Sequence, residues 1–373
     1  MSVEIHVLVV DDSAFMRRAI QKMCEAEPDL KVIATATSGE EGVEKAALLK
    51  PDVITMDVEM PGMGGLEAAR TLTSRNGPPI IMISSLTREG AETTLQALEI
   101  GAVDFIPKPD SAFIDILKVQ RELVEKIRHF GTRTAYLRAN RGKTIPSARP
   151  PTLAAAPPAP PQPSAPTAAP RPALSRTAKF ECVALGTSTG GPVALSQIIP
   201  KLPKDFPIPI VIVQHMPPGF TRPLSERLNS ASKIDVVEAE NGAILRGGTA
   251  YVAPAGQQLR LRRVAGGVEI VLAADTAKSL HVPSVDVMSA AVGETFGAGA
   301  LGVILTGMGH DGVEGLRVLK NLGGYVVGQD EASSVVYGMP RAAAVAGLVD
   351  RVVPLGEVAR TLCELTGASA PIV

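Results

Sequence analysis

Short apolar runs alternate with longer amphipathic segments along the first 130 residues of the chain. The apolar runs have the length of buried strands and are residues 6–10, 31–36, 52–57, 80–84 and 103–107. The segments after them repeat apolar residues at helical spacing and are residues 13–26, 39–50, 65–75, 90–101 and 113–130. Strands that alternate with helices predict a parallel sheet with helices on both faces.

A second alternating region follows residue 179. Its predicted strands are residues 182–186, 208–215, 249–254, 268–273, 302–307 and 325–330. Its predicted helices are residues 193–202, 220–230, 284–297, 312–323 and 339–348. We therefore expect another doubly wound α/β domain with a mostly parallel sheet, in which residues 244–272 form a hairpin-like exception.

The two regions are separated by a segment of different composition. Residues 140–176 are mainly Pro, Ala and Ser, with arginines and no acid. Such a segment buries too little surface to offset the entropy of ordering, so a spacer is the best interpretation, with a Pro-rich partner motif as the alternative. The predicted organisation is a first domain at 1–130, a linker at 131–178 and a second domain at 179–373.

Composition narrows the class of protein. The chain has 37 basic and 38 acidic residues, no tryptophan and no basic stripe, which argues against a nucleic-acid partner. Acids interrupt the first apolar run and no apolar run reaches spanning length, so neither a signal peptide nor membrane insertion is expected. Cys24, Cys182 and Cys363 are too scattered for a disulfide framework or a metal site. We expect a cytoplasmic monomer.

Polar residues gather at the carboxyl ends of the predicted strands in the first domain. They are Asp11 and Asp12 after the first strand, Asp57 on the third, Ser84 on the fourth and Lys108 after the fifth. These ends meet at one edge of a parallel sheet, where three carboxylates need a cation, and oxygen ligands suit Mg²⁺. Asp57 could then accept a phosphoryl group, with Lys108 offsetting its charge and Ser84 binding its oxygens. The alternative is that these acids only cap helices.

This pattern resembles the receiver domain of bacterial two-component response regulators from residue 4 to about residue 125. The resemblance implies a (βα)5 receiver that is phosphorylated on Asp57. It also implies that Asp12, Asp57 and the backbone carbonyl of Glu59 bind Mg²⁺ directly, with Asp11 contributing through water.

The second domain carries a serine in a glycine-rich turn. Ser188 is the centre of GTSTG, between a predicted strand and a predicted helix, as in the nucleophile elbow of hydrolases. A phosphate-binding loop fits less well, because this loop lacks the lysine and the glycine spacing of the known nucleotide motifs.

A nucleophilic serine needs a base, and the base needs an orienting carboxylate. His215 ends a predicted strand and is the preferred base over His310, whereas His281 is expected to face substrate or to be structural. The carboxylate candidates are Asp286, Asp311 and Asp330. Asp311 is preferred because it lies in another glycine-rich turn between strand and helix.

Longer blocks of sequence point to one family. GTSTGGP, VQHMPPGFTRPLSERLN, PSVDVM and ILTGMGHDGVEGL resemble the receptor methylesterase of bacterial chemotaxis, the CheB family. The resemblance implies that Ser188 is the nucleophile, His215 the acid and base, and Asp311 its orienter. It also implies oxyanion stabilisation by the backbone around Met308 and by Thr189.

The same resemblance implies a function and its partners. The substrates are γ-methyl esters of glutamate on methyl-accepting chemoreceptors, with deamidation of receptor glutamines by the same route. A chemotaxis histidine kinase is the implied phosphodonor, Mg²⁺ serves the receiver, and hydrolysis needs no cofactor. Two other classes stay open from the residues alone: an output domain that only binds a partner, and a DNA-binding regulator.

Overall fold

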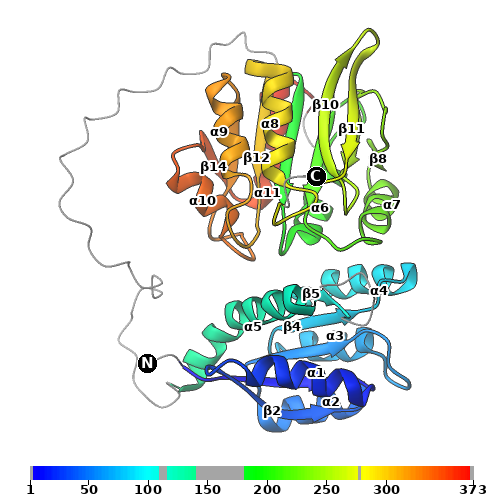
Figure 1. Cartoon of the computed structure of the whole chain (residues 1–373), viewed down its shortest axis with the longest axis vertical. Coiled ribbons are helices and arrows are strands. Elements are labelled where there is room, and N and C mark those ends of the chain that lie inside the picture. The colour runs from blue at the N-terminus through cyan, green and yellow to red at the C-terminus, as the bar shows by residue number, and fades with distance from the viewer. Residues whose placement is uncertain (1–2, 109–115, 140–179, 276–278, 370–373) are drawn as a thin grey trace, which may run out of the picture.

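The computed structural model describes residues 3–108, 116–139, 180–275 and 279–369. Figure 1 shows two α/β units, one from the first part of the chain and one from the second. Of the expected linker at 131–178, residues 140–178 lie outside the described residues. Within the described residues, no helix is long and apolar enough to cross a membrane.

The N-terminal unit is a five-stranded parallel sheet in the order β2-β1-β3-β4-β5. Its strands are β1 (Ile5–Val10), β2 (Leu30–Ala36), β3 (Val53–Asp57), β4 (Ile80–Ser84) and β5 (Asp104–Pro107). Its helices are α1 (Ala14–Glu25), α2 (Gly39–Leu49), α3 (Gly65–Ser74), α4 (Arg88–Glu99) and α5 (Ile116–Ala139). The central strands are buried along their length, which explains why they read as continuous apolar runs.

Local capping sets where several of these helices begin. The hydroxyls of Ser13, Ser38 and Thr87 each accept a backbone N–H from the first turn of α1, α2 and α4. The C-terminal end of α5 differs from the expectation, because the helix was predicted to end at residue 130 and runs to Ala139. Its last turns are polar enough to resemble linker, but Arg138 pairs with buried Asp52 and Ala135 packs in the core.

The C-terminal unit is a seven-stranded sheet in the order β14-β13-β12-β6-β7-β9-β8, and every strand pair is parallel. Its strands are β6 (Cys182–Thr187), β7 (Ile210–Gln214), β8 (Asp235–Glu238), β9 (Thr249–Val252), β12 (Ala300–Ile304), β13 (Tyr325–Gln329) and β14 (Arg351–Val353). A separate antiparallel hairpin joins β10 (Gln258–Val264) and β11 (Gly267–Ala273). The expected two-domain α/β fold is thus observed, with the hairpin as its exception.

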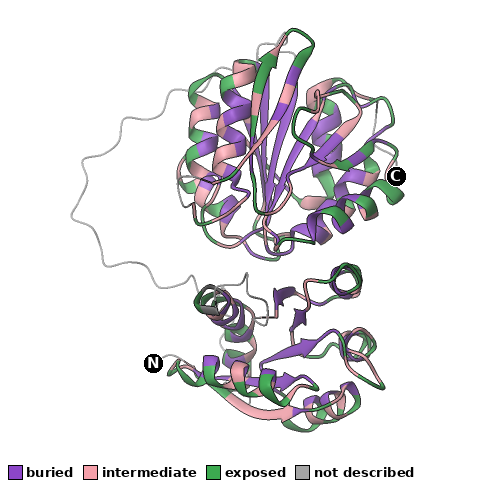
Figure 2. Cartoon of the chain, turned by 45° about the vertical axis from the view of Figure 1, so that its right-hand side comes forward, coloured by how far each residue is buried: buried purple, intermediate pink, exposed green. Residues whose placement is uncertain are grey.

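Helices cover both faces of this second sheet. They are α6 (Gly191–Ile198), α7 (Thr221–Ala231), α8 (Val285–Phe296), α9 (Val313–Asn321), α10 (Met339–Val345) and α11 (Leu355–Thr366), with short 3₁₀ turns η1 (Ile199–Lys201) and η2 (Gly297–Gly299). Figure 2 shows buried strands at the centre of each unit and exposed positions on the outer helix faces. All three cysteines are buried and free, as expected.

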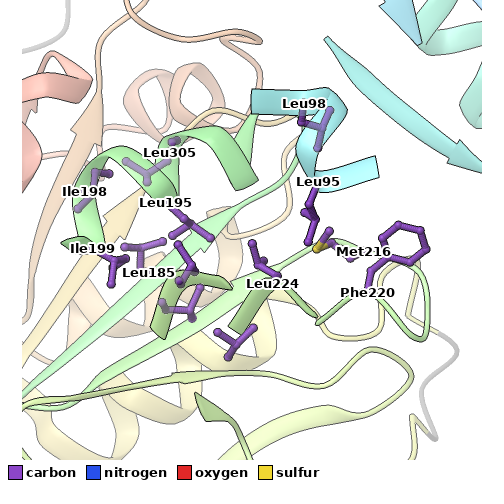
Figure 3. Close-up of a cluster of buried hydrophobic side chains, with 14 of the residues drawn as sticks. Leu95, Leu98, Leu185, Leu195, Ile198, Ile199, Met216, Phe220, Leu224 and Leu305 are labelled. Atoms are coloured by element: carbon purple, nitrogen blue, oxygen red, sulfur yellow. The ribbon is translucent and has the colours of Figure 1, made fainter. Parts of the chain in front are cut away.

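One hydrophobic cluster continues from the N-terminal unit into the C-terminal unit. Leu95 and Leu98 of α4 lie beside Met216, Phe220 and Leu224 of the β7–α7 region, as Figure 3 shows. All five side chains are buried, and they belong to segments far apart in the sequence. Through this cluster, the β5 edge of the N-terminal sheet faces the loops at the carboxyl ends of the C-terminal strands. The candidate site of the C-terminal unit lies in these loops.

Candidate active site

Ser188 lies in the tight turn between β6 and α6, as the motif predicted. Its side chain is partly exposed, and its backbone N–H donates to the Thr306 carbonyl at 3.0 Å. Gly190 has φ +78°, and a Cβ on Gly191 would lie 1.9 Å from Oε1 of Gln214. The two glycines therefore let the chain turn sharply and leave the serine at the start of α6.

His215 follows β7, the strand next to β6. Thr187 and Gln214 are paired in the parallel register, so Ser188 and His215 follow directly on neighbouring strand ends. The His215 N–H donates to the Thr187 carbonyl at 3.2 Å. The Gln214 amide donates to the carbonyls of both Ser188 and His215, at 3.0 and 2.9 Å, and so holds the two turns together.

Asp311 reaches His215 from the loop between β12 and α9. His215 Nε2 lies 2.7 Å from Asp311 Oδ2, and both side chains are at least nine-tenths buried. The same carboxylate accepts the Val285 N–H at 2.7 Å and the Ser284 hydroxyl at 2.8 Å. Burial opposes the charge, but the hydrogen bond and charge of His215 and the N–H donors outweigh it, so the pKa of Asp311 lies well below its ordinary value.

The other two carboxylate candidates are engaged elsewhere. Asp330 accepts the N–H and the hydroxyl of Ser333 at 3.0 and 2.5 Å. Asp286 accepts backbone N–H groups at the start of α9. His310, the rival base, is exposed. Of the candidates named from the sequence, the structure therefore brings together Ser188, His215 and Asp311.

The orientation of the His215 ring could not be read from the sequence. Because Nε2 faces Asp311, Nδ1 is the nitrogen left for the serine, and it is buried with no hydrogen-bond partner in the described part of the chain. Among the same residues, the Ser188 hydroxyl makes no hydrogen bond to His215. Contacts of this kind often tighten only when substrate binds.

His281, expected to face substrate or to be structural, is a direct neighbour of the candidate base. Its ring stacks on the His215 ring, with centroids 4.0 Å apart and planes inclined by 8°. The Gln258 amide donates to the His281 carbonyl at 3.1 Å, which fixes the loop that carries it. Its position in the sequence, before a Pro-Ser helix start, gave no signal of this contact.

Two backbone N–H groups near Ser188 suit an oxyanion. Gly307, the residue before Met308, approaches so closely that a Cβ on it would lie 2.8 Å from the Ser188 Cβ. In the described residues, the N–H groups of Thr189 and Met308 donate to no protein acceptor. Free N–H groups beside a candidate nucleophile are the kind of donors that a tetrahedral intermediate needs.

Comparisons with known proteins identify the family of the chain. Residues 183–362 match the CheB methylesterase family model, and residues 7–118 match that of the response regulator receiver domain. The crystal structure of the Thermotoga maritima CheB methylesterase catalytic domain is 42% identical, with a TM-score of 0.49, and covers 50% of this chain and 99% of that one. A protein-glutamate methylesterase/protein-glutamine glutaminase of Archaeoglobus fulgidus is 42% identical over 96% of this chain and 97% of its own length. A protein with that name from Oleidesulfovibrio alaskensis is 45% identical over 96% of this chain and 98% of its own.

The chain belongs to the CheB methylesterase family. The resemblance drawn from its sequence blocks is confirmed, as is the presence of a receiver domain in front of a methylesterase domain.

The receiver of this CheB family member carries the expected acidic cluster. Ligand oxygens of Asp11, Asp12 and Asp57 all lie within 4.8 Å of one another. Burial and the nearby Asp57 raise the pKa of Asp11 to about 6, and burial raises that of Asp57. Asp11 Oδ2 is buried without a partner among the described residues. An unpaired buried oxygen in a group of three carboxylates fits Mg²⁺, which prefers such ligands. The Glu59 side chain accepts the Ser85 hydroxyl, and its backbone carbonyl stays a predicted ligand.

The other two receiver residues contact different elements. Lys108 Nζ lies 2.8 Å from Asp57 Oδ2 and partly offsets the burial of that acid. Ser84 is fully buried, and its hydroxyl contacts the Gly90 carbonyl and the Thr94 hydroxyl of α4. Ser84 therefore connects the strand end next to Asp57 with helix α4, whose other residues contact the methylesterase domain.

Polar contacts join the two domains beside the candidate nucleophile. The Thr189 hydroxyl donates to Asp104 Oδ2 of β5 at 2.8 Å, and Asp104 is neutralised by buried Lys126 at 3.0 Å. Phe105 of β5 stacks on Phe220, with ring centroids 4.7 Å apart. The residue after Ser188 is thus held directly by the receiver. Asp104 was missed from the sequence, because a single acid at the start of a short strand carries no motif.

Two ion pairs lie at the rim of the same interface. Arg227 of α7 pairs with Glu99 of α4, and Arg88 of α4 pairs with Glu226 of α7 at 2.8 Å. All four side chains are at least one-third exposed, so each pair adds little stability in water. The two ion pairs do fix how α4 and α7 are aligned with each other.

Proposed function

We propose that this protein removes methyl groups from glutamate γ-methyl esters on chemoreceptors and deamidates receptor glutamines, under control of its own receiver. The observation that carries the proposal is the site in the C-terminal unit. A partly exposed serine at one strand end lies next to a buried His215–Asp311 pair at the neighbouring ends. The names of the relatives support the substrate class.

In the first half of the proposed reaction, Ser188 Oγ attacks the ester carbonyl carbon while His215 Nδ1 takes the serine proton. The ionised Asp311 stabilises the imidazolium through Nε2 and keeps the ring in place. The backbone N–H groups of Thr189 and Met308 donate to the oxyanion. The intermediate then collapses, and His215 gives its proton to the departing methanol oxygen.

In the second half, water attacks the glutamyl-Ser188 ester, and His215 Nδ1 takes one of its protons. The collapse returns this proton from His215 to Ser188 Oγ and leaves a glutamic acid side chain, which ionises by releasing its remaining proton to water. For a glutamine substrate the leaving group is ammonia, and the later steps are the same. His215 thus carries the protons that leave and return to Ser188 and the proton that the leaving group takes up.

We further propose that Asp57 is the phosphorylated residue and that a histidine kinase supplies the phosphoryl group. Asp11, Asp12 and Asp57 would hold Mg²⁺, which when bound offsets the repulsion between these acids and the incoming phosphoryl oxygens. Lys108 then balances the charge on modified Asp57. In this proposal Ser84 exchanges its contacts with α4 for one with a phosphoryl oxygen, which alters the position of that helix. We propose domain limits of residues 1–139 and 180–373, which take the end of α5 into account.

The contact between the domains supports a restraining role for the unmodified receiver. Asp104 holds the hydroxyl of Thr189, and α4 packs against the β7–α7 loop that follows His215. In this proposal, a receptor helix reaches Ser188 only after this interface, which lies directly beside it, has moved. Phosphorylation activates the enzyme in this proposal by favouring an arrangement in which the interface is open.

Reversing one charge at the rim should release part of this restraint. Arg227→Glu places two acids together at Glu99, and the methanol release rate without phosphodonor should rise about fivefold, the equivalent of ~1 kcal/mol. Adding Glu99→Arg restores an opposite pair and should return the rate to that of the wild type. A single variant that leaves the unphosphorylated rate unchanged, or a double variant as active as the single, contradicts the role of this interface.

The proposed activity is tested by methanol release from methylated receptor membranes, with and without a small phosphodonor and Mg²⁺. We expect release without phosphodonor and a faster rate with it. No release in either condition, when an unrelated methylesterase preparation releases methanol from the same membranes, would remove the proposal.

A further inference from the structure

Helices α8 and α9 begin side by side. The first N–H groups of each helix donate to an aspartate at the start of the other. Asp311, just before α9, accepts the N–H groups of Val285 and Asp286 at 2.7 and 3.1 Å. Asp286, in the first turn of α8, accepts the N–H groups of Gly312 and Gly315 through one oxygen at 2.9 and 2.8 Å. We call Asp286 and Asp311 the capping pair. Only Asp311 of this pair contacts His215.

Glycine makes this close approach of the two helices feasible. Gly312 has φ +105°, which other residues adopt only under strain. A Cβ on Gly315 would lie 2.2 Å from the Asp286 carbonyl oxygen and 2.7 Å from its Cα. A glycine inside a helix costs about 1 kcal/mol relative to alanine, so Gly315 needs a structural reason. The reason here is that the start of α8 rests directly on it.

The capping pair places two carboxylates in one partly buried region. Each faces the N–H groups and positive end of a helix, which favours an ionised acid. Asp311 also faces His215 and the Ser284 hydroxyl, whereas Asp286 faces backbone N–H groups and Asp311. Burial raises the pKa of Asp286 above its ordinary value. Burial acts on Asp311 too, but the hydrogen bond and charge of His215 outweigh it and lower the pKa of Asp311. The two carboxylates can lie close together because backbone N–H groups donate hydrogen bonds to both of them.

From this geometry we propose that Asp286 is a positioning residue for the hydrolytic reaction. It clamps Gly312 and Gly315, the residues that follow Asp311, and so sets the distance between Asp311 Oδ2 and His215 Nε2. Among the described residues, Asp286 makes no hydrogen bond or ion pair to His215 or Ser188, so it acts through Asp311. This inference rests on the proposed function and adds a residue to it.

The test compares variants of the full chain treated with phosphodonor. Asp286→Ala removes the acceptor for both N–H groups, and kcat for methanol release should fall about 100-fold with KM changed less than about twofold, as for a displaced catalytic group. Asp286→Asn keeps an oxygen that accepts both N–H groups and should retain kcat within about threefold. If Asp286→Ala does not fold, Asp286→Glu keeps an acceptor but displaces it by one methylene and should show the same loss of kcat.

Asp350→Ala is the matched control. Asp350 is a mostly buried acid of the same domain that accepts the Val326 N–H at 2.8 Å and pairs with Lys320 at 2.7 Å. This variant should lower Tm without lowering kcat. If Asp286→Ala loses a similar amount of Tm and keeps its kcat, Asp286 is an ordinary helix cap and the inference is wrong.

A second measurement does not depend on the substrate. The proton on His215 Nε2, bonded to Asp311, should give a low-field ¹H NMR signal in the wild type and in Asp286→Asn. We expect Asp286→Ala to broaden or lose it and Asp350→Ala to keep it. A wild type that shows the signal but releases no methanol defeats the proposed function alone, whereas an unchanged signal in Asp286→Ala defeats this inference alone.

Discussion

Replacing Ser188 with alanine should lower the rate of methanol release by about 10⁴-fold or more, since loss of the nucleophile removes the covalent route altogether. The change takes away one partly exposed oxygen, so the fold should be unaffected. The measurement is methanol release from methylated receptor membranes, in the presence of phosphodonor and Mg²⁺. Any residual activity would come from the oxyanion donors and from binding of the substrate in a fixed position.

A serine far from the strand ends serves as the control for this change. Ser230 is exposed on α7, where its hydroxyl donates to the Glu226 carbonyl, and Ser230→Ala should keep the wild-type rate. An artificial ester extends the test to substrates other than receptors. If Ser188→Ala hydrolyses either substrate at the rate of the wild type, the turn between β6 and α6 is a scaffold and the proposed mechanism fails.

The second large effect concerns the receiver. In Asp57→Asn, the ratio of methanol release with and without phosphodonor should fall to about 1, because an amide oxygen is too weak a nucleophile to accept the phosphoryl group. The amide has nearly the volume of the carboxylate and can still accept a hydrogen bond from Lys108, so the buried site should keep its packing. The rates with and without phosphodonor are compared on the same receptor membranes.

Glu44→Gln makes the same chemical change on the exposed face of α2 and should keep the full response to phosphodonor. Labelling with ³²P from the phosphodonor gives an independent check, since Asp57→Asn should take up no acid-stable, hydroxylamine-sensitive label. An Asp57→Asn protein whose hydrolysis still accelerates with phosphodonor contradicts control through Asp57.

The main elements of both sheets could be predicted because their strands are buried on both faces. Continuous apolar runs such as residues 6–10 and 182–186 need no tertiary information to be recognised. Three strands escaped this pattern: β8, β10 and β14. β8 and β14 are short edge strands, and β10 alternates apolar with charged residues. None of the three is buried on both faces, so none has a continuous apolar run in the sequence.

The candidate residues could be named because strand order brings carboxyl ends to one edge. Ser188 and His215 required only the rule that sites in parallel sheets lie there. Their catalytic roles remain predictions until a variant is measured. The choice among the three acids was weaker. Asp286 and Asp311 both lie near helix starts, Asp330 follows a strand, and nothing in their spacing ranks their distances to His215.

By itself, the sequence determined the fold class, the family and the strand ends at which chemistry is placed, because these depend on local periodicity and on residue types in short motifs. Tertiary structure alone decided that Asp311 faces His215 Nε2, that His281 stacks on this ring, and that Asp104 holds Thr189. These three contacts join residues that are 66 to 96 positions apart in the sequence. Such pairings depend on how helices and domains pack, and packing leaves no periodic signal along the chain.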